Sequence, residues 1–264
     1  MTRAEVLAQY RPIRAGIRRV LREAAKACGR ADLNRAVKQV APWAEAAELE
    51  EADTAEMLVD VALFEANQRG RRAFDRFLAE RGERLAATDR ALAERMAGAW
   101  FSIFRVAGPH EAVGLWLEDM LAGNRRLWLM DEALEASAPE GTIAGMRLFD
   151  AGPFHAGFGI IVEPDGETLD FCLGAKERGV PLPFRHSLAA TLYGDQLRAG
   201  APPGPADLAL LQTLAEILTS QPSMPAKAGP KQRGRQYQSR AGHQSPAGGN
   251  WEVPARMWWE MGVA

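Results

Sequence analysis

The chain has 264 residues, of which 47% are hydrophobic and 25% charged, so it can bury the core of one large domain or two modest ones without a metal or a disulfide. Its formal net charge of -2 at pH 7 gives no general preference for nucleic acid, and no stretch approaches the roughly 18 apolar residues of a membrane span. Its two cysteines, Cys28 and Cys172, are far apart and lack a CxxC spacing, which excludes a disulfide framework and a cysteine-based zinc site and predicts a cytoplasmic protein.

The first predicted helix begins after Thr2 and is amphipathic. Thr2 and Glu5 form a capping-box pattern, and apolar residues up to Ala24 recur three and four positions apart. Pro12 lies inside this pattern and predicts a short helix or a kink near Tyr10. The opposite face carries a basic stripe, which continues to Lys26 and whose arginines are Arg11, Arg14, Arg18 and Arg22.

The next segment reverses the sign of the charge. Residues 41–68 contain eight acidic residues and no Lys or Arg. We favour an interpretation in which the basic and acidic helices lie side by side and neutralise each other, because charged stripes on amphipathic helices are usually solvated faces. In the alternative interpretation the arginines of the basic stripe bind nucleic-acid phosphates with salt-sensitive affinity.

Three more helices are predicted before residue 100. The first starts at Asp53, and Gly70 interrupts the pattern after it. A short helix then ends near Gly82, and a last one over residues 85–99 leads directly into a strand.

Residues 100–162 consist of short apolar runs separated by Gly, Pro, Asn and Asp turns: WFSIFRV, VGLWLEDML, RRLWLM, TIAGMRLF and FHAGFGIIV. This pattern predicts a small antiparallel β-meander that curls into a barrel. The module contains three tryptophans, Trp100, Trp116 and Trp128. We expect these rings to fill the barrel interior rather than stack on a base or a peptide.

After the module, the chain is expected to become helical and then disordered. LDFCLG is a candidate sixth strand, Ser187 caps a predicted helix, and a second helix begins near Pro205. These helices are expected to cover an open face of the sheet. Residues 221–249 are rich in Pro, Gly, Gln, Ser and Lys/Arg and predict a disordered basic linker.

The terminal peptide, residues 250–264, is aromatic. One hypothesis is that it binds a protein partner through a cluster of large apolar side chains: Trp251, Met257, Trp258 and Trp259. The alternative is that the peptide completes the protein's own fold.

No motif in the sequence indicates a catalytic, metal or cofactor site. GxSxG, HExxH, Walker and Rossmann patterns are absent from the sequence. His155 follows Asp150 by five positions, which suggests a His–carboxylate pair, but no spacing forces them together and we favour a structural histidine. We therefore predict no catalytic residues, no metal and no cofactor.

The order of parts resembles an uncharacterised group of bacterial proteins. The resemblance is carried by ALFEANQRGRRAFDRFLAE, AWFSIFRV and LWLEDMLAGNRRLWLMD, with a "D-hydrophobic-hydrophobic-x-G" turn at residues 119–123. It covers about residues 55–160 and implies a helical region ahead of a compact β module. A similar module accompanies a SEC-C zinc motif elsewhere, but this chain has no cysteine after Cys172, so no zinc function is implied.

Together these patterns predict an α+β protein with five parts: helices at 1–99, an antiparallel β module at 100–180, covering helices at 181–220, a disordered linker at 221–249 and an aromatic peptide at 250–264. The leading functional hypothesis is a non-catalytic adaptor that binds a protein partner through the aromatic peptide. The alternatives are a nucleic-acid-associated protein that uses the basic stripe and linker, and a hydrolase-type enzyme with its site in the β module.

Overall fold

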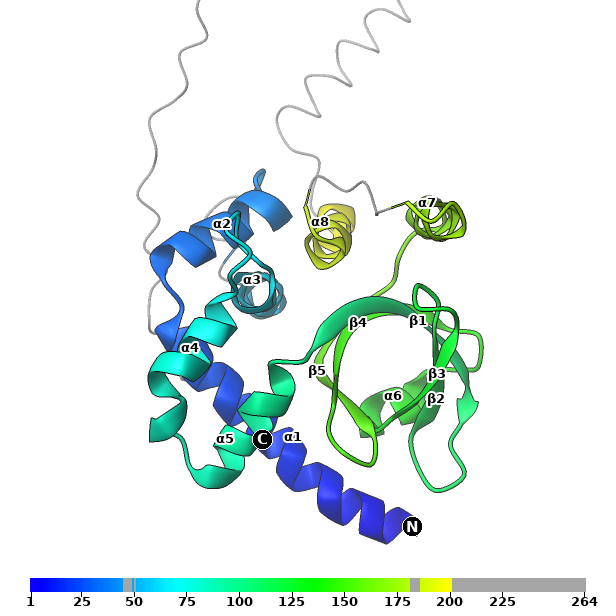
Figure 1. Ribbon diagram of the computed structural model, residues 1–264. Coiled ribbons are helices and arrows are strands. Elements are labelled where there is room, and N and C mark those ends of the chain that lie inside the picture. The colour runs from blue at the N-terminus through cyan, green and yellow to red at the C-terminus, as the bar shows by residue number, and fades with distance from the viewer. Residues whose placement is uncertain (45–48, 50, 181–185, 201–264) are drawn as a thin grey trace, which may run out of the picture. The chain divides into compact units, whose positions relative to one another are not determined.

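The computed structural model of the chain describes residues 1–44, 49, 51–180 and 186–200 (Figure 1). These residues form an α+β fold in which helices precede a closed five-stranded β-barrel, as the sequence predicts. The helix predicted near Pro205, the predicted linker and the predicted aromatic peptide lie outside the described residues. Within the described ranges, no helix combines the length and the apolar character needed to cross a membrane.

The first helix, α1 (Arg3–Ala27), is continuous through Pro12, so the predicted short first helix is wrong. Thr2 caps its N-terminus in the predicted capping box. A proline in a helix interior costs about 3 kcal/mol. The buried apolar face of α1 continues on both sides of the proline, with Tyr10 before it and Ile17 after it, and burial of such a face is what stabilises most helices in proteins.

Four further helices and a short 3-10 turn precede the barrel in the described chain: α2 (Arg30–Val40), α3 (Ala52–Phe64), α4 (Ala73–Arg81), η2 (Gly82–Arg84) and α5 (Ala87–Met96). The sequence predicts α3, α4 and α5, and Gly82 ends α4 as expected. It does not predict α2, because the N-cap residue Gly29 offers no side-chain hydrogen bond and the helix buries few residues.

The strands close into a barrel in the order β1-β2-β3-β5-β4. They are β1 (Trp100–Pro109), β2 (Leu115–Asp119), β3 (Arg125–Leu129), β4 (Ile143–Asp150) and β5 (His155–Val162). One core cluster consists mainly of buried side chains from four of these strands: Phe104, Val106, Leu115, Leu117, Leu127, Leu129, Ala144, Met146 and Leu148. The short helix α6 (Glu132–Ser137) adds Leu134 to this cluster, and Figure 1 shows α6 within the ring of strands as seen along the barrel.

The barrel differs from the predicted antiparallel meander in one pairing. β3 and β5 are parallel neighbours, aligned at Leu129 and His155. The cause is the connection that contains α6: it carries the chain from β3 to a strand that pairs with β1, and β5 then fills the remaining gap. Strands that are not joined by a tight hairpin need such a longer crossover.

Trp100 packs against the barrel core cluster, as predicted, but Trp128 packs against a different cluster, so the prediction that these rings fill the barrel interior is confirmed only in part. Trp100, Trp116 and Trp128 are each half-buried. The interior of a small barrel holds only a few side chains, and aliphatic and phenylalanine side chains already occupy it. Trp116 and Trp128 are instead partners across β2 and β3, and the His110 ring stacks on Trp128 with centroids 3.9 Å apart.

Two helices follow the barrel in the described chain. α7 (Gly166–Glu177) occupies the segment proposed as a sixth strand, because the Asp165 side chain caps a helix there. α8 (Leu188–Gly200) is the predicted helix, and the Ser187 hydroxyl accepts a backbone N–H of its first turn at 3.2 Å. Buried Tyr193 on α8 packs in one cluster with residues of α2, α3 and the barrel, so α8 covers the barrel as expected.

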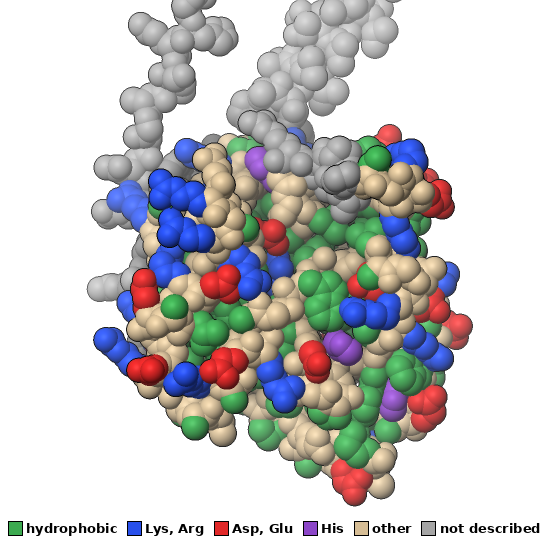
Figure 2. All heavy atoms as spheres, viewed as in Figure 1, with side chains coloured by type: hydrophobic (Ala, Val, Ile, Leu, Met, Phe, Trp, Pro, Cys, Tyr) green, Lys and Arg blue, Asp and Glu red, His purple; other side chains and the backbone are tan. Residues whose placement is uncertain are grey.

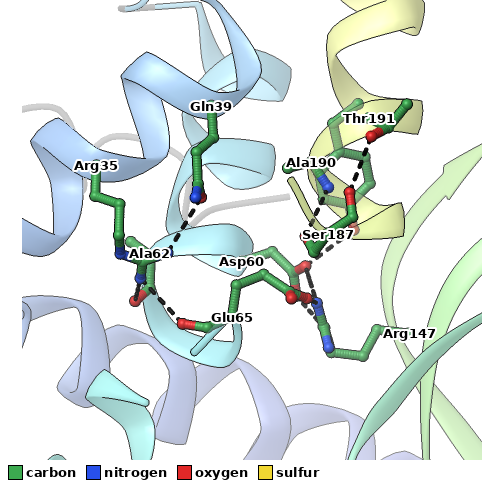
Figure 3. A network of polar contacts seen from close by, with 10 residues as sticks. Arg35, Gln39, Asp60, Ala62, Glu65, Arg147, Ser187, Ala190 and Thr191 are labelled. Atoms are coloured by element: carbon green, nitrogen blue, oxygen red, sulfur yellow. Dashed lines mark hydrogen bonds and ion pairs between the residues drawn. The ribbon is translucent and has the colours of Figure 1, made fainter. Parts of the chain in front are cut away.

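A buried ion cluster joins the helices to the barrel (Figure 3). Arg147 on β4 donates three hydrogen bonds to the carboxylate of Asp60 on α3, at 2.9 to 3.1 Å, and one to Glu65 at 2.6 Å. Tyr193 donates its hydroxyl to Asp60 at 3.1 Å. The side chains of Arg147 and Asp60 are 4% and 2% exposed. The cluster therefore ties three elements together away from water.

Two further contacts support this cluster. Burial by itself would lower the pKa of Arg147, but Asp60 and Glu65 raise it, so the guanidinium stays charged. Arg35 on α2 donates to the backbone carbonyls of Ala62 and Glu65 at 3.2 and 3.0 Å, which satisfies the C-terminal end of α3 (Figure 3).

Candidate functional site

A pocket lies at one end of the barrel, where each of the five strands contributes its terminal residue. These residues are Trp100 (first of β1), Asp119 (last of β2), Arg125 (first of β3), Asp150 (last of β4) and His155 (first of β5). With Ala122 they line a cavity of about 520 Å³, which we call the barrel-end pocket. This volume is in the range of pockets that hold small organic molecules.

The Asp119 carboxylate holds the wall of the pocket in place. It is 1% exposed, and its Oδ2 accepts the indole N–H of Trp100 at 3.2 Å. Its Oδ1 accepts the Ser102 hydroxyl at 2.6 Å and the backbone N–H groups of Leu121 and Ala122 at 3.2 and 3.1 Å. These bonds fix the turn that the sequence predicts after Asp119. Because both oxygens are occupied, Asp119 positions its neighbours and is not available to a ligand.

Trp100 lies between two other lining residues. The Arg125 guanidinium lies 5.2 Å from the centroid of its ring, and the His155 ring meets it edge-on at 5.7 Å between centroids. Arg125 is exposed and makes no ion pair with any described residue. A guanidinium in this state presents N–H donors in the fork geometry that suits a carboxylate or a phosphate.

His155 and Asp150 are register partners across β4 and β5, so the structure brings together the pair that the sequence left undecided. Nδ1 of His155 is buried and has no hydrogen-bond partner in the described part of the chain. Burial lowers the pKa of His155, and the Trp128 backbone and Asp150 oppose this effect. Asp150 accepts the Gly152 N–H at 2.7 Å and is otherwise exposed.

We expect His155 to make the stability depend on pH at values below the ordinary histidine pKa of 6.5. Its pKa is lowered in the folded protein, so the unfolded chain takes up the proton more readily. The free energy of unfolding should therefore be highest above the ordinary histidine value of 6.5 and fall as the pH decreases below it. Chemical denaturation of the wild type and of His155→Gln across this range measures the effect, and the variant should show a flatter dependence.

The matched comparison for this measurement is His110→Gln. Burial also lowers the pKa of His110, so this variant should remove a separate part of the same dependence. A dependence that is identical in His155→Gln and the wild type would contradict the assignment.

The arginines of the basic stripe do not share one environment. Arg11 pairs with Glu132 at 2.9 Å, and Arg14 donates to the carbonyl of Gly157 at 3.2 Å, so these two contact the β module. The remaining two are exposed: Arg18 and Arg22. On the face drawn in Figure 2, acidic and basic side chains are interspersed over the helices. Binding of nucleic acid by the stripe stays a prediction.

Charge compensation between α1 and α3 has one electrostatic interaction in its favour. Glu56 on α3 is exposed, and partial desolvation raises its pKa. Arg14 and Arg18 oppose this rise, so they lie within electrostatic reach of the carboxylate. The acidic and basic helices thus approach each other at this point.

The residues predicted to bind a protein partner, Trp251, Met257, Trp258 and Trp259, lie outside the described residues. Sequence reasoning did not find Trp100, Asp119 and Arg125 as pocket residues. The available signal was the position of each at a predicted strand boundary, where the apolar runs begin or end.

Metal and thiol chemistry find no support in the described residues. No group of three or more His, Cys, Asp or Glu side chains in these ranges could hold a metal ion. Cys28 and Cys172 are free thiols. Burial raises the pKa of Cys28 to about 11, which keeps this thiol protonated and unreactive at neutral pH.

Comparison with known proteins gives one match. DUF7986, described as a family of unknown function, matches residues 4–163 of the 264, a region that runs from α1 through β5 and contains every residue of the barrel-end pocket. No curated protein and no solved structure matches the chain. The bacterial origin in the predicted resemblance stays a prediction. Because the match covers more than half of its length, the chain belongs to the DUF7986 family of unknown function.

Proposed function

We propose that this protein binds a small organic molecule in the barrel-end pocket without transforming it. The observation that carries the proposal is a set of unused polar groups around an anchored aromatic ring. Arg125 and Asp150 line the pocket and make no ion pair with a described residue, and Trp100 is fixed by Asp119. Ligand pockets typically combine an aromatic or apolar surface with a few such polar groups.

Binding without chemistry is favoured because the described lining contains no activated nucleophile. The Ser102 hydroxyl, which donates to the lining residue Asp119 at 2.6 Å, is buried. A hydrolase-type enzyme is the second candidate, since Asp150 and His155 share both a register and the pocket. In that case His155 would act as a general base toward water, and His155→Ala should abolish the activity.

The adaptor function predicted for the aromatic peptide belongs to the same non-catalytic class and is a separate proposal. It rests on the sequence of residues 250–264. Co-purification with the intact chain and with a chain ending at residue 249 tests it, and a partner lost only on truncation would support it. Retention of the same partners by both chains would contradict it.

The pocket proposal predicts that a ligand will stabilise the protein against unfolding. We expect at least one compound in a library sorted into neutral, anionic, cationic and zwitterionic molecules to raise the melting temperature. At a concentration 100-fold above Kd, the gain in unfolding free energy is about 2.7 kcal/mol. The same compound should have little effect on Arg125→Gln or His155→Gln. The measurement is a thermal-shift screen followed by calorimetry.

Arg126→Gln provides the matched control for this screen. Arg126 follows Arg125 on the same strand, but its guanidinium lies over Trp116, 4.5 Å from the ring centroid, and it does not line the pocket. This variant should respond like the wild type. If no class of compound stabilised the wild type, or if every pocket variant still bound the same compound, the proposal would be wrong.

A further inference from the structure

We infer that the barrel-end pocket binds a small zwitterion of the free α-amino acid class, with its carboxylate at Arg125 and its ammonium group at Asp150. This inference rests on the proposed function and names the chemical class of the ligand.

A ligand in the pocket would meet few charged groups that are free to bind it. Asp119 is excluded, because four donors occupy its two oxygens. Two charged lining residues remain, Arg125 and Asp150, and they have opposite signs. Both are exposed and neither makes an ion pair with a described residue. The pocket therefore offers one positive and one negative group.

Neither of these two charges is paired with an opposite charge in the described chain. The Arg125 guanidinium lies over the ring of Trp100, whose indole N–H donates to Asp119. The Asp150 carboxylate accepts the Gly152 N–H at 2.7 Å. Both groups therefore keep their charge available to a ligand.

A ligand in the pocket would lie close to both charges. Arg125 and Asp150 both line the pocket, together with His155, which is the register partner of Asp150. The ring of Trp100 belongs to the same lining and adds an apolar surface for the carbon atoms of the molecule.

Ligands of different charge would interact differently with these two groups. A purely anionic molecule would pair with Arg125 but be repelled by Asp150. A purely cationic molecule would pair with Asp150 but be repelled by Arg125. A neutral molecule would desolvate both charged groups without pairing either, which is costly. A zwitterion pairs both, and an α-amino acid is the smallest common molecule with a carboxylate and an ammonium group on one carbon.

The experiment uses the full chain and the proteinogenic amino acids as probes. Thermal shift selects the amino acid that stabilises most, and calorimetry then compares it with its C-terminal amide and its N-acetyl derivative. Because a charge-assisted hydrogen bond is strong, removal of either charge should weaken binding by about tenfold or more. Arg125→Gln should abolish the preference for the free acid over the amide. Asp150→Asn should abolish the preference for the free amine over the acetylated form.

The outcomes separate this inference from the proposed function. If no free amino acid binds, but a singly charged or neutral compound binds and is lost in His155→Gln, the zwitterion inference is overturned and the pocket stands. If amino acids bind with unchanged affinity in both Arg125→Gln and Asp150→Asn, the assignment of their charged groups is wrong. Unchanged binding in Arg126→Gln, together with the two selective losses, would establish it.

Discussion

Replacement of Arg147 by alanine is expected to lower the free energy of unfolding by about 3–5 kcal/mol. Arg147 is 4% exposed and is bonded to two carboxylates, Asp60 and Glu65. Its removal leaves Asp60 buried at 2% exposure without a charged partner, and it also removes the group that lies over the rings of Phe64 and Phe101. Equilibrium denaturation of the two proteins measures the loss.

The matched control is Arg105→Ala, because Arg105 also pairs with a glutamate, Glu118, on the barrel but is 48% exposed. Exposed pairs of this kind contribute less than about 1 kcal/mol. The double variant Asp60→Leu with Arg147→Met replaces both partners of the buried pair. It should recover part of the lost free energy of unfolding. If Arg147→Ala cost no more than Arg105→Ala, the buried cluster would not be what joins the helices to the barrel.

The sequence predicts well those features that depend on local chemistry. The capping box at Thr2, the end of α4 at Gly82 and the cap at Ser187 each depend on a few adjacent residues, and all three are confirmed. The prediction of a short first helix is wrong, because the buried face of α1 is a tertiary property that overrides the local cost of Pro12.

The order of the strands is harder to predict, because strand closure depends on distant partners. The five apolar runs of residues 100–162 correctly predict the five strands. The parallel neighbours β3 and β5 depend on the path taken by the α6 connection, which no local pattern encodes. The helix α7 is a different case, because its cap is local: Asp165 accepts the backbone N–H of Thr168, and the prediction of a strand overlooked this signal.

The candidate site was only partly predictable for the same reason. Asp150 and His155 could be found as a pair in sequence, but their alignment depends on the register of a hairpin. Arg125 and Trp100 are distant in sequence and meet only when the barrel closes. One usable signal was Arg147, a single charge inside the apolar run IAGMRLF, which is typical of a buried ion pair.

The second large effect is expected at Gly114, where Gly114→Ala should lower the free energy of unfolding by about 2–5 kcal/mol, as the sum of backbone strain and overpacking. Gly114 has a φ of +82°, a conformation that L side chains rarely adopt. An added Cβ would also overlap the backbone carbonyl oxygen of Leu129. Leu129 cannot move freely, because it is paired to Leu115 on one side and to His155 on the other.

Gly123→Ala separates the two causes of this loss. Gly123 has a similar φ of +75°, but a Cβ there would have no neighbour within 4 Å. This variant should therefore lose only the strain of the left-handed conformation, about 1–2 kcal/mol. Equal losses in the two variants, measured by denaturation, would mean that the barrel relaxes around Leu129. A larger loss at Gly114 together with weaker ligand binding would show that the packing of β2 against β3 holds His155 in the pocket, because Leu129 and His155 are register partners.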